Sequence, residues 1–418
     1  MLTLNFRLNI RGLPLLLGLL IINSISEAQN NGWNEVSSLT SRRWGHTSIV
    51  QDDHIYLIGG MQGFNLSGEV PANSLWRYNP LTEGYETLDQ MEFGRALFSA
   101  QKYNGNIYVI GGAKRVFGNT TLINTIEAYD PNNDSWTTIS ELPTSRFTHI
   151  AKIINQKLYV IGGATPNWEP IGQVDIYNME TDTWISGTPM PTPRASISAV
   201  VINEKIYTIG GHQGTSTNES GEKLVEVYDA SSDSWTTISE MPIKVKMSTA
   251  SVYEDKIYVF GGAEGYCTPA IAAIQVYDLV NGTWSIIEDM PEELAWSSSV
   301  QHNGKIYLSG GLSGNCTTYS IKSTMYEFDP SFEVTSLDKS NGFHWKVYPN
   351  PAKDYINIQF DTIKPYKIEI FNNLGQQLLL KIANTPSESI NISKLPKGIY
   401  MLKLTSRKRY IREQIILN

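Results

Sequence analysis

The segment Ile107-Tyr-Val-Ile-Gly-Gly112 decides the architecture of this chain, because it recurs. It resembles the end of a β-strand, rich in β-branched and aromatic residues. Two glycines close it, where a positive φ or a close backbone approach is expected. The pattern occurs at intervals of 52, 51, 48, 51 and 49 residues, ending at Gly59-Gly60, Gly111-Gly112, Gly162-Gly163, Gly210-Gly211, Gly261-Gly262 and Gly310-Gly311. Such a regular period indicates a repeat protein.

One repeat predicts four short strands. In the second copy, residues 96–103 form an apolar-rich strand that ends at the tight turn Asn104-Gly105, and residues 106–110 form the next strand. Residues 123–129 and 136–139 predict the third and fourth strands. Four short antiparallel strands per repeat form one blade of a β-propeller.

Aromatic residues support the same alignment of the copies. A tyrosine precedes a tryptophan by seven positions in four copies: Tyr129 and Trp136, Tyr177 and Trp184, Tyr228 and Trp235, Tyr277 and Trp284. In the first copy, Tyr85 stands in place of the tryptophan, seven positions after Tyr78. We expect these large side chains to fill the wedge between neighbouring blades.

A glycine doublet followed by such a Tyr and Trp resembles the Kelch repeat. The resemblance covers residues 29–332 and implies an all-β, six-bladed Kelch-type β-propeller. The sixth copy has no tryptophan at the expected spacing after Phe328, whereas Trp33 lies upstream of the first doublet without a copy of its own. We therefore predict that an N-terminal strand completes the last blade and hides two open sheet edges.

The beginning of the chain predicts export. Residues 1–28 resemble a signal peptide, with Arg7 and Arg11 before a short apolar run and Ser26-Glu27-Ala28 as a cleavage site. No later segment approaches the 18 apolar residues of a membrane-spanning helix. We expect no transmembrane segment after removal of the signal, and a linker at residues 333–343.

Residues 344–418 predict a separate small β-sandwich. This segment resembles the C-terminal sorting domain of the type IX secretion system, on the motifs Tyr348-Pro-Asn-Pro351, Asn373-Leu-Gly375, Gly398-Ile-Tyr400 and Arg407-Lys-Arg409. The resemblance implies the type IX machinery as a partner. It also implies a secreted or cell-surface location in a Gram-negative, Bacteroidetes-type bacterium. An ordinary accessory β-domain is the alternative.

Charge argues against nucleic acid as a partner. The chain has 33 basic and 41 acidic residues, a net charge of −8. Residues 343–418 hold 12 basic and 5 acidic residues, so the repeats between residues 29 and 342 are strongly acidic. An acidic surface repels phosphate backbones.

The two cysteines occupy equivalent places in adjacent copies. Cys267 and Cys316 each lie five residues after the second glycine of a doublet. Equivalent loops of neighbouring blades lie side by side, so a disulfide is expected in an oxidising compartment. Two free thiols too far apart to bridge are the alternative.

Four arginines share one position, 16 residues before the first glycine of a doublet: Arg43, Arg95, Arg146 and Arg194. Val245 and Leu294 replace them in the last two copies. An arginine ring near a channel mouth could bind an anion. The favoured interpretation is that each arginine pairs with acidic groups or carbonyls between blades.

The variable loops after the doublets are the best candidates for ligand binding, because they leave the same end of equivalent strands. Their candidate residues are Phe64, Arg115, Phe117, Trp168, His212, Glu219, Glu222, Tyr266 and Tyr319. Aromatic residues with a few charges suit the recognition of a sugar or a protein. Local packing is the alternative for each of them.

Two functions compete. The first is an exported, non-catalytic binding module for a glycan or a protein. The second is a carbohydrate-active enzyme such as a six-bladed Kelch mutarotase of sialic acid. That chemistry needs an acid/base pair beside an anion-binding arginine, and Arg95, Arg146 or Arg194 with Glu219 or Glu222 could supply this arrangement. No hydrolase, P-loop, dinucleotide or metal motif occurs, so no metal or cofactor is predicted.

Overall fold

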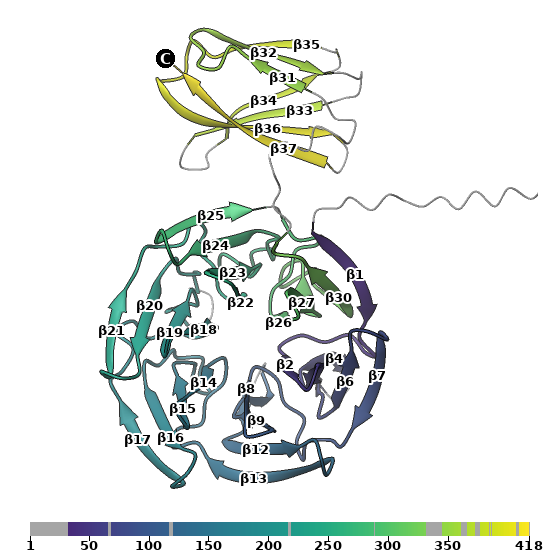
Figure 1. Cartoon of the computed structure of the whole chain (residues 1–418), viewed down its shortest axis with the longest axis vertical. Helices are drawn as coiled ribbons and strands as arrows, with labels where there is room; N and C mark the ends of the chain where they lie inside the picture. Colours follow the sequence, from purple (N-terminus) through teal and green to yellow (C-terminus); the bar gives the residue numbers. More distant parts are fainter. Residues whose placement is uncertain are drawn as a thin grey trace, which may run out of the picture. The chain divides into compact units, whose positions relative to one another are not determined.

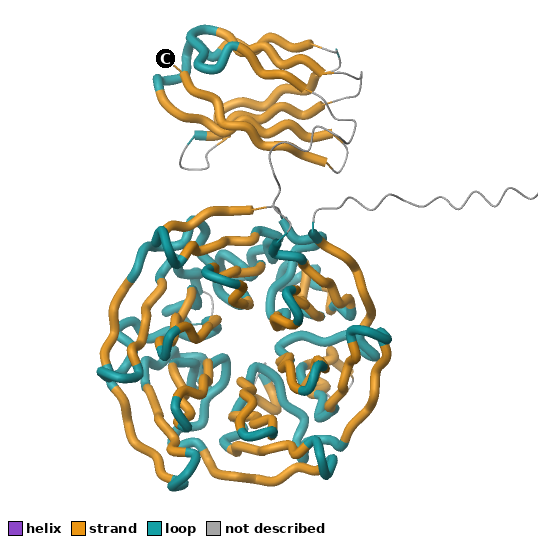
Figure 2. Tube along the Cα trace, viewed as in Figure 1, coloured by secondary structure: helices purple, strands orange, loops and turns teal. Residues whose placement is uncertain are grey.

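The computed structural model of the chain describes residues 32–65, 68–116, 120–215, 219–287, 289–331, 345–360, 366–372, 377–383, 385, 387–406 and 409–417. The chain divides into two compact units, Met1–Phe332 and Glu333–Asn418. The expected signal peptide at 1–28 and the expected linker at 333–343 lie outside the described residues. Figure 2 shows strands and loops throughout the described parts of the chain.

Within residues 32–331, the structure describes six four-stranded antiparallel sheets, which are the blades of a propeller (Figure 1). Blade 1 contains β2 (Thr47–Gln51), β3 (His54–Ile58), β6 (Leu75–Asn79) and β7 (Gly84–Leu88). Blade 2 contains β8 (Ser99–Tyr103), β9 (Asn106–Ile110), β12 (Thr125–Asp130) and β13 (Ser135–Glu141). Blade 3 contains β14 (Ile150–Ile154), β15 (Lys157–Ile161), β16 (Val174–Asn178) and β17 (Thr183–Gly187). Blade 4 contains β18 (Ser198–Ile202), β19 (Lys205–Ile209), β20 (Val225–Asp229) and β21 (Ser234–Thr237). Blade 5 contains β22 (Thr249–Tyr253), β23 (Lys256–Phe260), β24 (Ile274–Asp278) and β25 (Thr283–Ile287).

Blade 6 is completed by the N-terminal strand, as the sequence predicts. It contains β26 (Ser298–His302), β27 (Lys305–Ser309), β30 (Thr324–Phe328) and β1 (Trp33–Ser38). β1 pairs antiparallel with β30, with Trp33 opposite Phe328 (Figure 1). The Trp33 ring lies 4.7 Å from that of Phe328 and packs against Phe260 of blade 5. A strand from one end of the propeller sequence thus closes the sheet at the other end.

The hydrophobic core of the propeller lies between the blades. The tyrosine–tryptophan pairs are cross-strand neighbours with ring centroids 4.9–5.2 Å apart. Tyr78 and Tyr85 pair in the same way at 4.8 Å, which confirms that Tyr85 takes the place of a tryptophan. The indole N–H of Trp136 donates to the carbonyl of Asp89 in the preceding blade. These rings therefore join each blade to its neighbour, as expected.

Two sets of backbone hydrogen bonds link the blades around the propeller axis. In one set, the second glycine of each doublet donates to the carbonyl at the arginine position of the next blade, and the bond from Gly311 to Arg43 closes the ring at 2.8 Å. In the other, six residues donate in turn around a closed ring: Gly45, Leu97, Thr148, Ser196, Met247 and Trp296. All six have φ between 49° and 61°. Hydrogen bonds at both sides of each residue offset the cost of this left-handed conformation.

The close approach of the blades explains the glycine doublets. Gly111 and Gly112 have φ of 60° and 97°. A Cβ atom on Gly112 would lie 2.6 Å from the Cβ of Phe98 and 2.9 Å from the carbonyl oxygen of Ala96. Only glycine therefore allows the strand end to approach the inner turn of its own blade.

Short hairpins extend three of the loops that follow the doublets. They are β4 (Met61–Asn65) with β5 (Gly68–Pro71), β10 (Ala113–Arg115) with β11 (Thr121–Leu122), and β28 (Leu312–Ser313) with β29 (Ser320–Ile321). The sequence patterns did not predict these strands, because the loops lack regular alternation.

The C-terminal unit is a β-sandwich with its own core. One sheet has the order β31 (Trp345–Tyr348), β32 (Tyr355–Phe360), β35 (Ser387–Asn391). The other has the order β34 (Gln377–Ala383), β33 (Tyr366–Phe371), β36 (Gly398–Ser406), β37 (Arg409–Leu417). Ile356, Ile368 and Leu402 are among the side chains buried between the sheets. Across all described residues of the chain, no helix has the length and apolar character needed to cross a membrane.

Candidate ligand-binding pocket

The inner turns of the blades meet the post-doublet loops at one end of the propeller. In every blade, the residue after the arginine position forms a backbone bridge with the residue after the doublet: Trp44 with Met61, Ala96 with Ala113, Phe147 with Ala164, Ala195 with His212, Lys246 with Ala263, and Ala295 with Leu312. Most of these residues join one apolar cluster around the axis. The cluster forms the base on which the loops rest.

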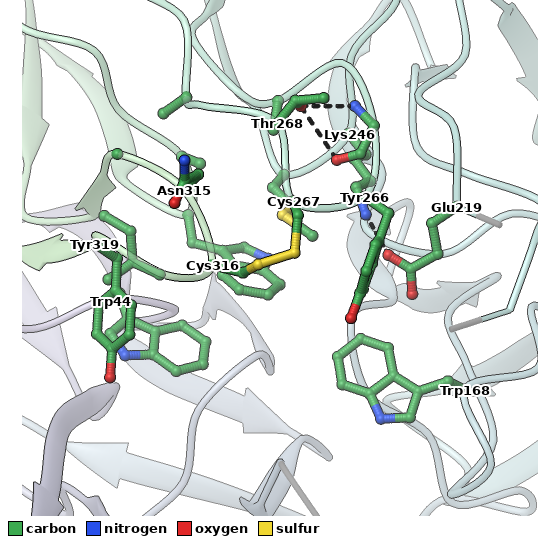
Figure 3. A pocket seen from close by; sticks show the side chains of 18 residues that line it. Trp44, Trp168, Glu219, Lys246, Tyr266, Cys267, Thr268, Asn315, Cys316 and Tyr319 are labelled. Atoms are coloured by element: carbon green, nitrogen blue, oxygen red, sulfur yellow. Dashed lines mark hydrogen bonds and ion pairs between the residues drawn. A yellow bond between two sulfur atoms is a disulfide. The ribbon is translucent and has the colours of Figure 1, made fainter. Parts of the chain in front are cut away.

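A pocket of about 520 Å³ opens above this base, between the loops of blades 5 and 6 (Figure 3). Tyr266 and Cys267 belong to the loop between β23 and β24, and Cys316 and Tyr319 belong to the loop between β28 and β29. The apolar part of the wall includes Leu312. The pocket is the size of a small-molecule site.

Aromatic side chains from four blades line the pocket. Trp44 stacks on Trp296, with ring centroids 4.7 Å apart and planes 24° from parallel. Trp168 is held edge-on against Phe147 at 4.6 Å. Tyr266 and Tyr319 are 50% and 44% exposed, so their rings are accessible to a ligand. In Figure 3, Tyr266 and Trp168 lie on one side of the pocket and Trp44 and Tyr319 on the other.

The disulfide forms part of the pocket wall. Cys267 and Cys316 are bonded, with Cα atoms 4.9 Å apart, as predicted from their equivalent positions in adjacent copies (Figure 3). The N–H of Ala270 also donates to the carbonyl of Gly314 at 3.0 Å. The loops of blades 5 and 6 are therefore joined beside the two exposed tyrosines.

One ion pair lies in the pocket wall. Lys246, at the entry to blade 5, bonds Glu219 from the β19–β20 loop of blade 4. The side chains are only 2% and 8% exposed. Each of the two side chains holds the other in place, because separating them would leave a buried charge without a counterion.

His212 lies buried beside this pair. Its Nδ1 is 2.9 Å from the carbonyl oxygen of Gly214, which assigns the proton to that nitrogen. Burial lowers the pKa of His212, Glu219 raises it, and Lys246 lowers it again. The imidazole is therefore neutral at neutral pH.

The arginines do not line the pocket. All four side chains are completely buried. Each donates to the carbonyl of the first glycine of its own blade, as Arg43 does to Gly59 at 2.7 Å. Arg194 also pairs with Glu226 at 2.7 Å, and Arg95 and Arg146 bond Glu127 and Asp175. The favoured pairing with carboxylates and carbonyls is thus what the structure contains, but the partners lie within the same blade rather than between blades.

The residue at a second position of the repeat depends on whether the arginine is present in the same blade. Two residues before the aromatic residue of the third strand stand Trp76, Glu127, Asp175, Glu226, Gln275 and Tyr326. The three carboxylates occur in blades whose arginine they bind, whereas Arg43 lies over the ring of Trp76, 3.6 Å from its centroid. The two blades without arginine have no acid there. An alignment of the six copies could have predicted this pairing.

The structure brings together four of the nine loop residues that the sequence suggested for ligand binding. Trp168, Glu219, Tyr266 and Tyr319 come together in the pocket. His212 is buried beside it, and the Glu222 carboxylate, outside the pocket, accepts a hydrogen bond from Gln213 at 3.0 Å. The side chains of Phe64 and Arg115 are not described, and Phe117 lies outside the described residues.

Sequence reasoning missed Trp44, Trp296 and Lys246. All three lie in the inner turn that follows the arginine position. The sequence pattern placed this turn in the first strand, as residues 96–103 of the second copy, whereas the structure begins that strand at Ser99. The signal was available, since Lys246 is the single charged residue at its position among the six copies. Among the described residues, no group of His, Cys, Asp or Glu could hold a metal ion.

Comparison with known proteins agrees with this architecture. A profile of the KLHDC2/KLHL20/DRC7 Kelch-repeats domain matches residues 97–311, and the Attractin/LZTR1 beta-propeller profile matches residues 21–165. The secretion system C-terminal sorting domain matches residues 346–418. The structure of YjhT superposes with a TM-score of 0.59 at 17% identity, over 69% of this chain and 96% of that chain, and this likeness concerns the fold alone.

Curated relatives share the repeats at moderate identity. Kelch-like protein 40 of Xenopus laevis is 32% identical over 131 residues, which is 31% of this chain and 20% of that protein. Kelch-like protein 36 of Bos taurus is 27% identical over 240 residues, 56% of this chain and 38% of that protein. The chain thus spans well under half the length of these relatives.

The sorting domain indicates that the protein reaches the cell surface or the medium through the type IX machinery of a Bacteroidetes-type bacterium. The Kelch-repeats profile covers just over half of the chain, and the described repeats form six blades with the strand order and glycine geometry expected of such repeats. This chain therefore belongs to the Kelch-repeat β-propeller family, with a C-terminal sorting domain for type IX secretion appended to it.

Proposed function

We propose that this exported propeller is a non-catalytic carbohydrate-binding module. The observation that carries the proposal is the pocket with aromatic walls at the loop end of the propeller. Aromatic ring faces carry negative partial charge and attract the weakly positive C–H groups on the flat face of a sugar ring. Thr268 and Asn315 at the pocket add polar groups that can meet sugar hydroxyls.

The same pocket favours binding over turnover. Proton transfer to and from a sugar needs an acid and a base within reach of the ligand. The pocket contains one carboxylate among its described residues, Glu219, and this group is already paired with Lys246. The arginines that a mutarotase of acidic sugars would need are enclosed within their blades. Their burial supports a structural role.

The anchoring of the pocket also supports a binding role. The disulfide joins the two loops that carry Tyr266 and Tyr319. Trp44 and Trp296 belong to inner turns that are connected by backbone hydrogen bonds around the axis. Holding aromatic side chains in place before the ligand arrives reduces the entropy lost on binding.

A glycan array probed with the full exported chain tests the proposal, followed by calorimetry on the best ligand. We expect Trp168→Ala to weaken binding by about tenfold or more, since truncating a well-packed aromatic contact removes 1.5 kcal/mol or more of binding free energy. Phe93→Ala is the matched control, because Phe93 is an exposed aromatic residue outside the pocket.

Three results would overturn the proposal. They are binding of peptides but of no glycan, glycan binding that Trp168→Ala leaves unchanged, and accelerated anomer exchange of sialic acid measured by NMR. The last result would instead support the enzymatic alternative.

A further inference from the structure

The pocket carries no net charge. Of the described residues that line it, only Glu219 and Lys246 have acidic or basic side chains of opposite formal charge, and they form an ion pair with each other. Tyr266 and Tyr319 are phenols, and the two cysteines are joined in the disulfide. A ligand in this pocket therefore meets no unpaired charge.

The other charged side chains near the pocket do not line it, including Glu264, an exposed residue between the lining residues Ala263 and Gly265. His212 is neutral because burial lowers its pKa. Lys244 donates to the hydroxyl of Ser220 at 3.0 Å and does not line the pocket. The guanidinium groups of Arg146 and Arg194 are buried with their own carboxylates.

The ion pair still offers hydrogen bonds to a ligand. The Oε2 atom of Glu219 accepts from Lys246, whereas its Oε1 atom has no hydrogen-bond partner among the described residues. The ammonium of Lys246 has three protons, of which Glu219 takes one. The pocket wall thus presents a carboxylate acceptor and an ammonium donor from two side chains that are themselves hydrogen-bonded to each other.

We propose that the pocket selects an uncharged pyranose, with two adjacent hydroxyls bound by Glu219 and Lys246 and a C–H face on the aromatic rings. This inference rests on the proposed carbohydrate-binding function and names its ligand class. Neighbouring hydroxyls on a pyranose lie side by side and each can donate or accept, so one can donate to Oε1 while the next accepts from the ammonium.

Acidic sugars are excluded by the same arrangement. A carboxylate or sulfate would lose its hydration in the pocket and find Glu219 close by. Lys246 could not compensate, because its charge is already neutralised. A buried charge without a partner is strongly unfavourable.

The test compares neutral and acidic oligosaccharides on the full exported chain. The probes are glucose-, mannose- and galactose-terminated glycans beside sialylated and uronate-terminated glycans of matched length. We expect wild type to bind a neutral set at least about tenfold more tightly than the acidic set, which corresponds to one charge-assisted hydrogen bond.

Glu219→Gln should reverse this preference. The variant keeps the size of the side chain and frees the charge of Lys246, so neutral glycans should bind about tenfold more weakly and acidic glycans more tightly. Glu222→Gln, a carboxylate outside the pocket, should leave both sets unchanged. If the single variant unfolds, the double variant Glu219→Gln with Lys246→Gln serves in its place. It restores the neutrality of the pocket and should keep the preference for neutral glycans.

The outcomes separate this inference from the proposed function. Wild-type binding of acidic glycans that depends on Trp168 would overturn the neutral-ligand inference and leave the carbohydrate-binding function in place. Binding of neutral glycans that Glu219→Gln does not weaken would overturn the role of the ion pair. Absence of any Trp168-dependent glycan binding would overturn the function itself.

Discussion

At the scale of single residues, the buried arginines show how one repeat position meets different requirements. Arg194 caps the carbonyl of Gly210 and pairs with Glu226, whereas Val245 in the next blade has Gln275 as its counterpart. The amide oxygen of Gln275 accepts the N–H of Ile243 at 2.7 Å. Blades 4 and 5 therefore hold a paired charge and no charge, respectively, at this position, and neither leaves a buried carboxylate without a countercharge. Blade 1 holds Arg43 without a carboxylate, over the ring of Trp76.

Removing one partner should be costly for this reason. We expect Arg194→Val to lower the free energy of unfolding by about 3–5 kcal/mol, because the Glu226 carboxylate is left buried without a countercharge. Arg194→Val combined with Glu226→Gln copies the fifth blade and should recover most of the loss. Urea unfolding measures both, and a double variant no more stable than the single one would contradict the argument.

Two buried histidines should make stability depend on pH. Burial lowers the pKa of His46 and of His149 to about 3, and the neighbouring Arg43 and Arg146 act in the same direction. In the unfolded chain the value is about 6.5, so the unfolded state binds protons first as the pH falls. The stabilisation is complete above about pH 6.5 and is lost toward pH 3, by about 1.4 kcal/mol per pH unit for each histidine.

Urea unfolding between pH 4.5 and 7.5 measures this dependence. The variant His149→Gln should reduce the slope by the share of one histidine. A slope identical to that of wild type would show that His149 does not contribute.

At the scale of elements, β1 decides whether the propeller closes. Trp33→Ala should lower the free energy of unfolding by about 3–5 kcal/mol, since it empties a buried aromatic site between blades 5 and 6. Asn34→Ala, on the exposed side of the same strand, is the control and should be nearly neutral. Deletion of residues 30–38 should be more damaging still, and an unchanged melting temperature for that deletion would contradict closure by β1.

The disulfide holds two loops together and is not part of the core between the blades. Cys267→Ser combined with Cys316→Ser should leave the melting transition of the propeller largely in place, because the core lies between the sheets. Glycan affinity should fall by about tenfold, the cost of ordering Tyr266 and Tyr319 on binding. Calorimetry tests this, and full affinity after loss of the disulfide would show that the loops need no cross-link.

At the scale of the whole molecule, the two units have separate cores. The apolar cluster of the C-terminal sandwich contains only residues from that unit. A chain ending at residue 343 should therefore keep the melting temperature of the propeller but remain in the periplasm, because the sorting domain is missing. Cell fractionation measures the second effect, and release of the truncated chain into the medium would contradict it.

Much of the fold could be predicted from local patterns. The glycine doublets and the Tyr–Trp spacing predicted six blades, and Trp33 predicted the closing strand, because each reports a packing requirement repeated along the chain. In the sorting domain, β31 and β35 were not predicted. β35 (Ser387–Asn391) is mostly polar and lacks the β-branched and aromatic residues typical of a strand, apart from Ile390.

The amino-acid sequence by itself determined the number of blades, the closing strand, the cysteine pair and the separate sorting domain, because these depend on periodicity, composition and equivalent positions in neighbouring copies. Only the tertiary structure decided which side chains form the pocket. Trp44, Trp168, Lys246 and Tyr319 come from four different blades, and closing the ring brings their inner turns and loops to one end of the axis. No local pattern records a contact between residues so distant in sequence, so the pocket and the ion pair between Glu219 and Lys246 in its wall became evident only once the blades were assembled.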